Sequence, residues 1–408
     1  MLHAIDTKGE PGKELWAYVP RAVLPDIGQT TARGYTFKTR LDGTPVVGKS
    51  GANSKLLVAG MGAAGRSYYA IDVSSPSGLS ETQLAAKVKW EFPLAGDATT
   101  QSKVGQTVGK PAVVRLGNGS YVVLVTSGYN SSFDGQGRMW MLNAATGATI
   151  HEFVTDAGTL ADESGLAHIK PFYEPDGSVR YVYGGDLKGN LWQFDLQAQS
   201  TPSLVAVLKD GSGNLQPVTA PPELVSYKDK RIILVGTGRL LDIGDFGAAA
   251  VRTFYAIADG STLTNARSGL AQGVYTKATD ALTAPSVNWT TGRGWYMDLP
   301  VGEEANTEPS VARGLVAFTT NVAGKTDCSA SSYLYVINVV TGDKSTVTSF
   351  VGTTVSAIAN SSRASLWLTE NGDVVATGQT TDGKPFKVDV SPKKIITPNK
   401  NAWRDVRR

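Results

Sequence analysis

The chain has 408 residues, a hydrophobic fraction of 41% and a formal net charge of +3. Its 39 basic and 36 acidic residues nearly balance, so the composition gives no indication of a nucleic-acid-binding protein. No run of about 18 apolar residues is present, which argues against a transmembrane helix.

Short apolar strands recur along the whole chain, each ending at a turn. A strand that in most cases ends on Asp or Asn recurs at residues 2–6, 69–72, 140–143, 191–195, 255–258 and 335–338. Most of these strands follow another short strand, at 56–60, 121–128, 232–238 and 315–320, and several precede a third, at 14–18, 88–92 and 150–154. With a last unit at 365–388, this irregular repeat predicts an all-β fold, a seven-bladed β-propeller formed as a single domain by residues 1–408.

The start of the chain enters a predicted strand directly, without a signal-peptide pattern. The first unit has strands at 2–6 and 14–18 but no strand before them. A propeller normally pairs its two chain ends within one blade. The alternatives are a cytoplasmic protein and the C-terminal part of a larger protein with its targeting signal upstream. We expect the second, and expect residues 402–406 to supply the missing strand.

Two long polar segments interrupt the repeat, at residues 23–53 and 259–289. Both are rich in Gly, Thr and Ser, so they are predicted as loop insertions. Loops vary without disturbing the pairing of strands, which makes these segments candidate contact surfaces. Plain surface decoration explains them equally well.

Local patterns add one helix and exclude one nucleotide site. Residues 80–88 begin with a capping pattern and predict a short helix. Residues 60–65 spell G-x-G-x-x-G, but a strand follows instead of the helix that a bound pyrophosphate requires. This segment is therefore predicted to be a glycine-rich hairpin turn.

A β-hairpin over residues 181–195 is the clearest local prediction. It has an apolar arm, a polar turn and a second arm that alternates between apolar and polar residues. Its structural motif consists of Gly185, Asp186, Gly189, Asn190 and Trp192.

The preceding turn contains the only calcium candidates that we retain, Glu174 and Asp176. Calcium sites require several acidic or amide oxygens around a turn-forming glycine. This turn includes Pro175 and ends on Arg180, where a closing carboxylate would be expected. A simple type I turn is favoured, so no metal site is assigned and calcium stays an alternative. The acidic turn at residues 133–137 is a weaker match.

Residues for catalysis are scarce. The 3 histidines form no zinc-binding pattern, and no G-x-S-x-G motif is present. The single cysteine, Cys328, lies in a polar segment. It is either a free thiol or one half of a disulfide to a cysteine elsewhere in the parent protein.

Two segments, 4–16 and 142–147, resemble the blade signature of quinoprotein dehydrogenases, in which a tryptophan docks between neighbouring blades. The blades are therefore expected to be quinoprotein-like, and a PQQ-dependent enzyme is the alternative function. Those enzymes typically carry vicinal cysteines and a calcium ion held by acids and an amide, and this sequence has no such set of residues. Recognition of a glycan by Trp289 or Trp295 is a further alternative, although tryptophans in propellers more often fill blade interfaces.

In its motifs and their order, the chain resembles the C-terminal propeller domain of the PilC/PilY family of type IV pilus adhesins and biogenesis factors. The resemblance covers nearly the whole length and rests on the segments 1–6, 14–20, 57–62, 69–73, 109–111, 127–129, 183–192, 236–239, 294–300 and 403–404.

The resemblance implies a non-enzymatic pilus assembly and adhesion domain with no bound cofactor. It implies minor pilins as partners, contact with a host or abiotic surface, and an N-terminal adhesive region in the same parent chain. It places the protein at the bacterial surface, at the pilus tip or peripheral to the outer membrane, and implies a role in pilus extension and twitching motility. Relatives often carry a calcium loop before the Tyr-x-Gly-Asp-Leu hairpin, and here only Glu174 and Asp176 remain of its acids.

Overall fold

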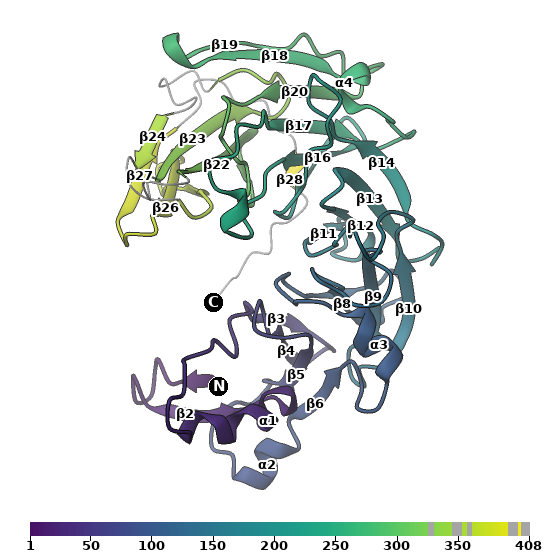
Figure 1. Cartoon of the computed structure of the whole chain (residues 1–408), viewed down its shortest axis with the longest axis vertical. Helices are drawn as coiled ribbons and strands as arrows, with labels where there is room; N and C mark the ends of the chain where they lie inside the picture. Colours follow the sequence, from purple (N-terminus) through teal and green to yellow (C-terminus); the bar gives the residue numbers. More distant parts are fainter. Residues whose placement is uncertain (325–329, 345–352, 357–360, 391–398, 401–408) are drawn as a thin grey trace. The chain divides into compact units, whose positions relative to one another are not determined.

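The computed structural model describes residues 1–324, 330–344, 353–356, 361–390 and 399–400. The chain divides into two compact units, Met1–Val182 with Phe194–Pro202 and Tyr183–Gln193 with Ser203–Arg408. Within the described ranges, the strands form seven small sheets in chain order (Figure 1). Antiparallel pairing of consecutive strands dominates, which confirms the all-β prediction and is compatible with seven blades.

The first unit contains three whole sheets and a few short helices. A two-stranded sheet pairs β1 (Leu2–Ile5) with β2 (Glu14–Tyr18), and two four-stranded sheets follow. The first of these consists of β3 (Val46–Lys49), β4 (Lys55–Gly60), β5 (Tyr68–Asp72) and β6 (Val88–Phe92). The second consists of β7 (Ala112–Arg115), β8 (Tyr121–Thr126), β9 (Arg138–Asn143) and β10 (Thr149–Val154). The helical segments are η1 (Arg21–Val23), α1 (Leu24–Ile27), η2 (Gly28–Thr31), α2 (Glu81–Ala85) and α3 (Ala98–Lys103).

The boundary between the units falls inside the fourth sheet. Its strands are β11 (Ile169–Tyr173), β12 (Val179–Gly185), β13 (Asn190–Asp195) and β14 (Ser203–Val207), in that order. Strands β12 and β13 form the hairpin that the sequence predicts for residues 181–195.

The second unit contains the largest sheet, with the order β19-β18-β20-β17-β16-β15-β28. Its members are β15 (Glu223–Tyr227), β16 (Lys230–Gly236), β17 (Thr253–Ala258), β18 (Ala271–Thr276), β19 (Ala281–Thr283), β20 (Gly294–Asp298) and β28 (Asn399–Lys400). The helical segments of this unit are η3 (Ile243–Asp245), α4 (Ala266–Gly269) and η4 (Lys277–Thr279).

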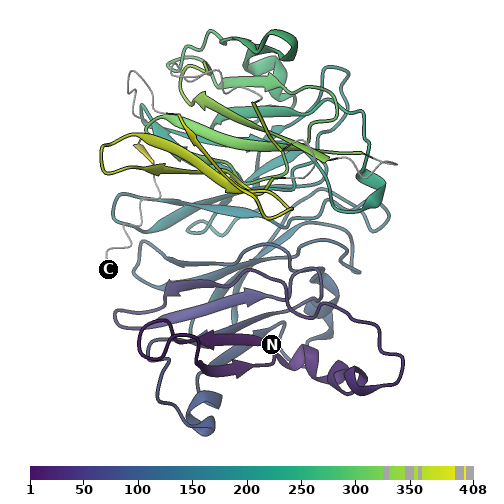
Figure 2. The same ribbon diagram turned by 90° about the vertical axis from the view of Figure 1, so that its left-hand side faces the viewer.

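Two further sheets complete the second unit. One contains β21 (Ser310–Ala312), β22 (Leu315–Ala323), β23 (Ala330–Asn338) and β24 (Thr353–Ser356). The other contains β25 (Ser365–Leu368), β26 (Val374–Gln379) and β27 (Pro385–Asp389). Figure 2 shows this last sheet in yellow beside the green strands of the preceding sheet.

Both segments predicted as loop insertions contain regular structure. Residues 23–53 include α1, η2 and β3, and β3 is the first strand of its sheet. Residues 259–289 contain α4, β18 and β19, and β18 pairs in parallel with β20. Residues 259–289 therefore add two strands, β18 and β19, to one edge of a sheet.

Local predictions agree with the structure in most places. Ser80 caps α2 by a capping box with Gln83, as the pattern at residues 80–88 predicts. Residues 61–67 connect β4 to β5, which confirms the hairpin turn predicted for this glycine-rich segment. Residues 402–406, predicted to complete the first sheet, lie outside the described residues.

Hydrophobic side chains fill the space between sheets that follow one another. In the first unit, Val58 and Trp90 pack with Val123 and Trp140 of the next sheet. Similar cores join β15–β20 to β21–β24 and then β21–β24 to β25–β27. Alternating apolar residues on both faces of the central strands make these stacked cores possible.

Candidate functional site

The predicted turn motif of the hairpin is organised around a buried carboxylate, Asp186. One of its oxygens accepts hydrogen bonds from the backbone N–H groups of Lys188 and Asn190, each at 2.9 Å. The other accepts from the Asn190 side chain and from the Trp192 indole, also at 2.9 Å. The turn therefore satisfies its acid entirely with donors of its own hairpin.

The two glycines of this motif are required by close packing. A Cβ atom at Gly185 would lie 2.4 Å from Val218 Cγ1, and one at Gly189, where φ is +72°, would lie 2.7 Å from the Leu208 carbonyl oxygen. Asp186 is consequently sealed from solvent, with a relative exposure of 0%. Burial raises the pKa of Asp186, although hydrogen bonds from Trp192 and Asn190 oppose the shift. The motif is a structural device rather than a binding site.

Asp176, a calcium candidate, is engaged by protein groups. Its Oδ1 accepts from the backbone N–H and hydroxyl of Ser178 at 2.9 and 2.6 Å, and its Oδ2 accepts from Arg115 Nη2 at 3.1 Å. The hydrogen bonds from Ser178, followed by the Arg115 guanidinium, lower the pKa of Asp176 to about 2. Glu174 contributes backbone groups to the same turn by pairing with Ser178 and Gly177.

A second acidic turn uses an arginine in the same way. Asp134 receives two hydrogen bonds from the Arg138 guanidinium, at 2.7 and 2.5 Å, and Arg138 lowers its pKa. Within the described ranges, no three Asp, Glu, His or Cys side chains gather as a metal-binding group. Since Arg115 supplies the positive charge at Asp176, the residues around Glu174 do not fit a calcium ion.

We expect calcium to leave the stability of the domain unchanged. Melting curves recorded with about 2 mM CaCl₂ and with about 2 mM EDTA should superimpose, because a ligand raises the melting temperature only where it binds the folded state. Isothermal titration of the chelator-treated protein checks binding directly. Micromolar binding that disappears in Asp176→Asn would restore the calcium interpretation.

Other predicted residues are buried or lie outside the described chain. Trp289 and Trp295 have exposures of 4% and 0%, and their indoles donate to the carbonyl oxygens of Val340 and Val339 at 2.7 and 2.9 Å. Their burial gives no support to the alternative of glycan recognition by these two residues. Cys328 lies in the segment 325–329, outside the described residues.

Tryptophans join neighbouring sheets by a repeated contact. Trp90 of β6 donates to the Ala144 carbonyl oxygen at 3.0 Å, in the turn that follows β9. Trp295 of β20 makes the equivalent contact in the turn that follows β23. Gly147 lies against the first indole, where an added Cβ would come within 2.5 Å of the ring. This is the docking contact that the quinoprotein-like signature implies.

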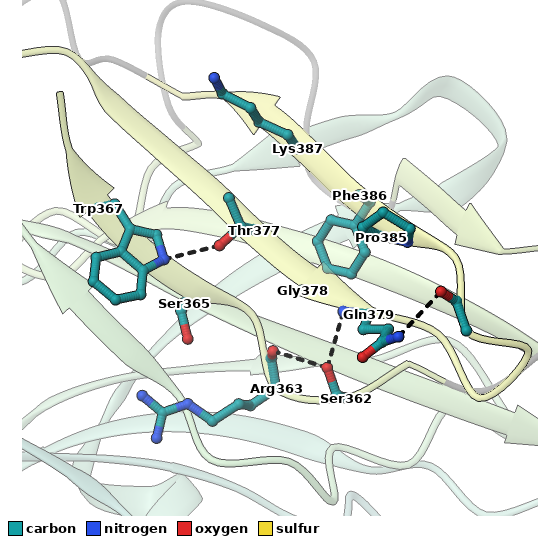
Figure 3. A pocket seen from close by; sticks show the side chains of 11 residues that line it. Ser362, Arg363, Ser365, Trp367, Thr377, Gly378, Gln379, Pro385, Phe386 and Lys387 are labelled. Atoms are coloured by element: carbon teal, nitrogen blue, oxygen red, sulfur yellow. Dashed lines mark hydrogen bonds between the residues drawn. The ribbon is translucent and has the colours of Figure 1, made fainter. Parts of the chain in front are cut away.

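A candidate site is a groove on the last sheet, lined by 11 residues from the segments 362–367, 377–379 and 383–387 (Figure 3). Its volume is about 750 Å³. Trp367 of β25 is 61% exposed, and its indole N–H donates to Thr377 Oγ1 on β26 at 2.8 Å. Of the seven tryptophans within the described residues, the other six are buried.

The register places polar groups in a row beside this indole. Ser365 lies opposite Thr377, and Thr377 lies opposite Lys387, so the three side chains share one face of the sheet. Directly beside Thr377, Gly378 makes room for Phe386, whose ring would meet an added Cβ at 2.4 Å. The groove thus combines a fixed aromatic surface with two hydroxyls and an ammonium group.

This groove was not predicted from the sequence. The available signal was the alternation Ser365-Leu366-Trp367-Leu368, in which Trp367 shares its phase with a serine. That phase places Trp367 on the face opposite Leu366, which packs against the core.

The described residues contain no helix long and apolar enough to cross a membrane.

Comparison with known proteins identifies what the chain resembles. A family model described as the PilY1 beta-propeller domain matches residues 1–284. A type IV pilus biogenesis factor PilY1 homolog of Xylella fastidiosa is 33% identical over 386 residues, covering 84% of this chain and 25% of the relative. The type IV pilus biogenesis factor PilY1 of Pseudomonas aeruginosa PAO1 is 28% identical over 417 residues, covering 86% of this chain and 34% of the relative.

A solved structure gives the same fold. The crystal structure of the Pseudomonas aeruginosa PilY1 C-terminal domain has a TM-score of 0.71 at 22% identity, covering 96% of this chain and 90% of that one. The predicted β-propeller fold is thereby confirmed. The chain spans between a quarter and about a third of the length of these curated relatives.

Proposed function

Because the chain belongs to the PilY1 β-propeller family, we propose that it is a non-enzymatic interaction domain of a type IV pilus biogenesis factor. The family match over residues 1–284 carries this proposal. The relatives are named as biogenesis factors, which supports a pilus-related role.

We further propose that the domain engages minor pilins at the pilus tip and supports pilus extension, twitching motility and attachment to host or abiotic surfaces. It would act at the cell surface, peripheral to the outer membrane, together with an N-terminal adhesive region of the parent chain. Calcium has no part in this proposal, because Arg115 and Ser178 engage the acid of the turn.

The insertion at residues 259–289 is the favoured contact surface. Its Arg267 forms paired hydrogen bonds with Asp298 of β20, at 2.6 and 2.8 Å, and stacks on Tyr296 at 4.4 Å. This anchor fixes α4, which precedes β18 in the chain, against β20, while Val274 of β18 remains 51% exposed. A rigid, partly apolar segment is suited to protein contacts.

The two buried acids Glu303 and Glu304 do not support the quinoprotein alternative, because both are paired with groups of the protein. Glu303 is fully buried and accepts hydrogen bonds from Thr320 and Tyr335 at 2.6 Å and from Lys277 at 2.9 Å. Glu304 is 2% exposed and pairs with Arg252 at 2.7 Å. Both acids are used to join segments of the protein interior, which favours a structural role for them.

The test is genetic and uses the full-length parent protein. Val274→Glu, introduced at the chromosomal locus, is expected to reduce surface pili and twitching zones at least about fivefold. The new carboxylate would be buried without a partner charge when the pilus protein binds, and this weakens an apolar contact. Sheared surface pilin and zone diameter are the measurements, and immunoblots establish equal protein levels.

Two matched variants interpret the result. Val301→Glu changes a valine that is 62% exposed outside the insertion and should leave piliation normal. Deletion of residues 1–408 from the parent protein should abolish or strongly reduce piliation. Normal piliation in the deletion strain would contradict a role in biogenesis, whereas normal piliation in Val274→Glu alone would contradict only the assigned surface.

A further inference from the structure

We propose that the groove on the last sheet, beside Trp367, binds an acidic saccharide. This inference goes beyond the proposed pilus role and does not depend on it. It rests on the exposed indole, the row of polar groups beside it and the charge of the lining.

The indole is suited to stacking against a sugar ring. Trp367 is 61% exposed, yet its N–H is held by Thr377 Oγ1 at 2.8 Å, so the ring has a fixed orientation on the sheet surface. A planar aromatic face offers apolar contact to the C–H groups of a saccharide. Because the ring is already oriented, binding costs little additional side-chain entropy.

The polar row supplies hydrogen bonds at a matching position. Ser365, Thr377 and Lys387 lie opposite one another on β25, β26 and β27. Neighbouring strands are about 4.8 Å apart, so the row spans roughly 10 Å beside the indole. Hydroxyl and ammonium groups at this spacing can contact several substituents of one or two sugar rings (Figure 3).

The charge of the groove favours an anion. Arg363 and Lys387 are lining residues, and the lining contains no Asp or Glu. In the described part of the chain, Arg363 pairs with Glu308, whereas Lys387 forms no ion pair. Asp389 lies opposite Val375, the partner of Trp367, so this acid is on the same face two residues from Lys387, although it does not line the groove. Lys387 is therefore the group that would meet a carboxylate or sulfate of the ligand.

The floor of the groove is fixed independently of any ligand. The Gln379 backbone N–H donates to Ser362 Oγ at 3.1 Å, and the Gln379 side chain donates to the Gly383 carbonyl oxygen at 3.0 Å (Figure 3). Phe386 fills the space above Gly378 and packs against the core. The site is consequently preformed, as small-molecule sites usually are.

The experiment begins with the purified 408-residue chain on an array of acidic and neutral glycans. Titrations then use 3′-sialyllactose and trigalacturonate as acidic saccharides, lactose and cellotriose as neutral ones, and hexaglutamate as an acidic peptide. We expect at least one acidic saccharide to bind and to change the tryptophan fluorescence. Trp367→Ala should weaken this binding about tenfold or more.

Two matched variants locate the interaction. Lys387→Gln should weaken acidic saccharides at least about fivefold and should leave any neutral saccharide unaffected. Leu368→Ala, at an exposed neighbour of Trp367 outside the lining, should bind normally. Equal melting temperatures of all variants would show that each is folded.

Three outcomes would overturn the proposal. The first is an array without any binding, and the second is saccharide binding that is unchanged in Trp367→Ala. The third is Trp367-dependent binding of hexaglutamate alone, which would assign the groove to an acidic protein segment. Piliation of the Trp367→Ala strain is a separate readout, so failure of this proposal leaves the pilus proposal intact.

Discussion

Replacing Asp186 by alanine is expected to lower the free energy of unfolding by about 3 kcal/mol or more. The substitution removes the acceptor for the backbone donors of Lys188 and Asn190, for the Asn190 side chain and for the Trp192 indole. Trp192 is 2% exposed, so its N–H group cannot form a replacement hydrogen bond with water.

The chain contains a natural control for this substitution. Asp210 forms the same turn, accepting from the backbone of Ser212 and Asn214 and from the Asn214 side chain at 2.8–2.9 Å. That turn is exposed and has no tryptophan donor. Asp210→Ala should therefore cost only about 1 kcal/mol.

Denaturant unfolding of both variants measures the difference. Equal losses at the two positions would show that burial and the Trp192 contact add nothing to the turn. Asp186→Asn keeps the shape of the side chain but loses one acceptor oxygen, and its amide N–H group would face the N–H donors that now bond to Asp186. It should be nearly as damaging as alanine.

Replacing Trp295 by alanine is expected to cost about 3–5 kcal/mol, the range for truncating a buried aromatic side chain. Trp295 has an exposure of 0% and packs at 6.1 Å from Phe254, which stacks on Phe318 at 3.9 Å. Its N–H group also joins β20 to the turn after β23. The cavity would therefore open between two sheets, where few side chains can move to fill it.

Trp367→Ala is the matched control, because the same residue type is removed from the surface. We expect a change of less than about 0.5 kcal/mol, as for most exposed positions. Thermal unfolding of the two variants makes the comparison. A Trp295→Ala protein with the parental melting temperature would contradict the docking role assigned to this indole.

Much of the strand pattern could be predicted from local sequence. The hairpin at residues 181–195 and the capped helix α2 are determined by turn residues and alternation, which act over a few positions. The strands inside residues 259–289 were missed, although β18 and β19 form a short antiparallel pair. The pairing of β18 with β20 is parallel, and such pairing leaves no hairpin signal in the sequence.

The candidate site was harder to predict because exposure depends on distant residues. Asp186 and Asp210 lie in turns of nearly the same sequence, yet only Asp186 is enclosed, by Val218 and Trp192. Similarly, the sequence leaves Asp176 as a calcium candidate, and only the structure shows that Arg115, far away in sequence, donates to its Oδ2. Trp367 looks like the other tryptophans, and only its register beside Thr377 shows that it faces outward.

The succession of sheets also has a consequence for the order of folding. Apart from β28, each described sheet is composed of strands that follow one another in the chain, so a polypeptide delivered from its N-terminus can complete one sheet before the next emerges. The indole N–H groups of Trp90 and Trp295 form their hydrogen bonds only after the acceptor carbonyl groups, at Ala144 and Val339, have been synthesised. These two sheets are thereby fixed by the sheets that follow them, and the pairing of β28 with β15 comes last.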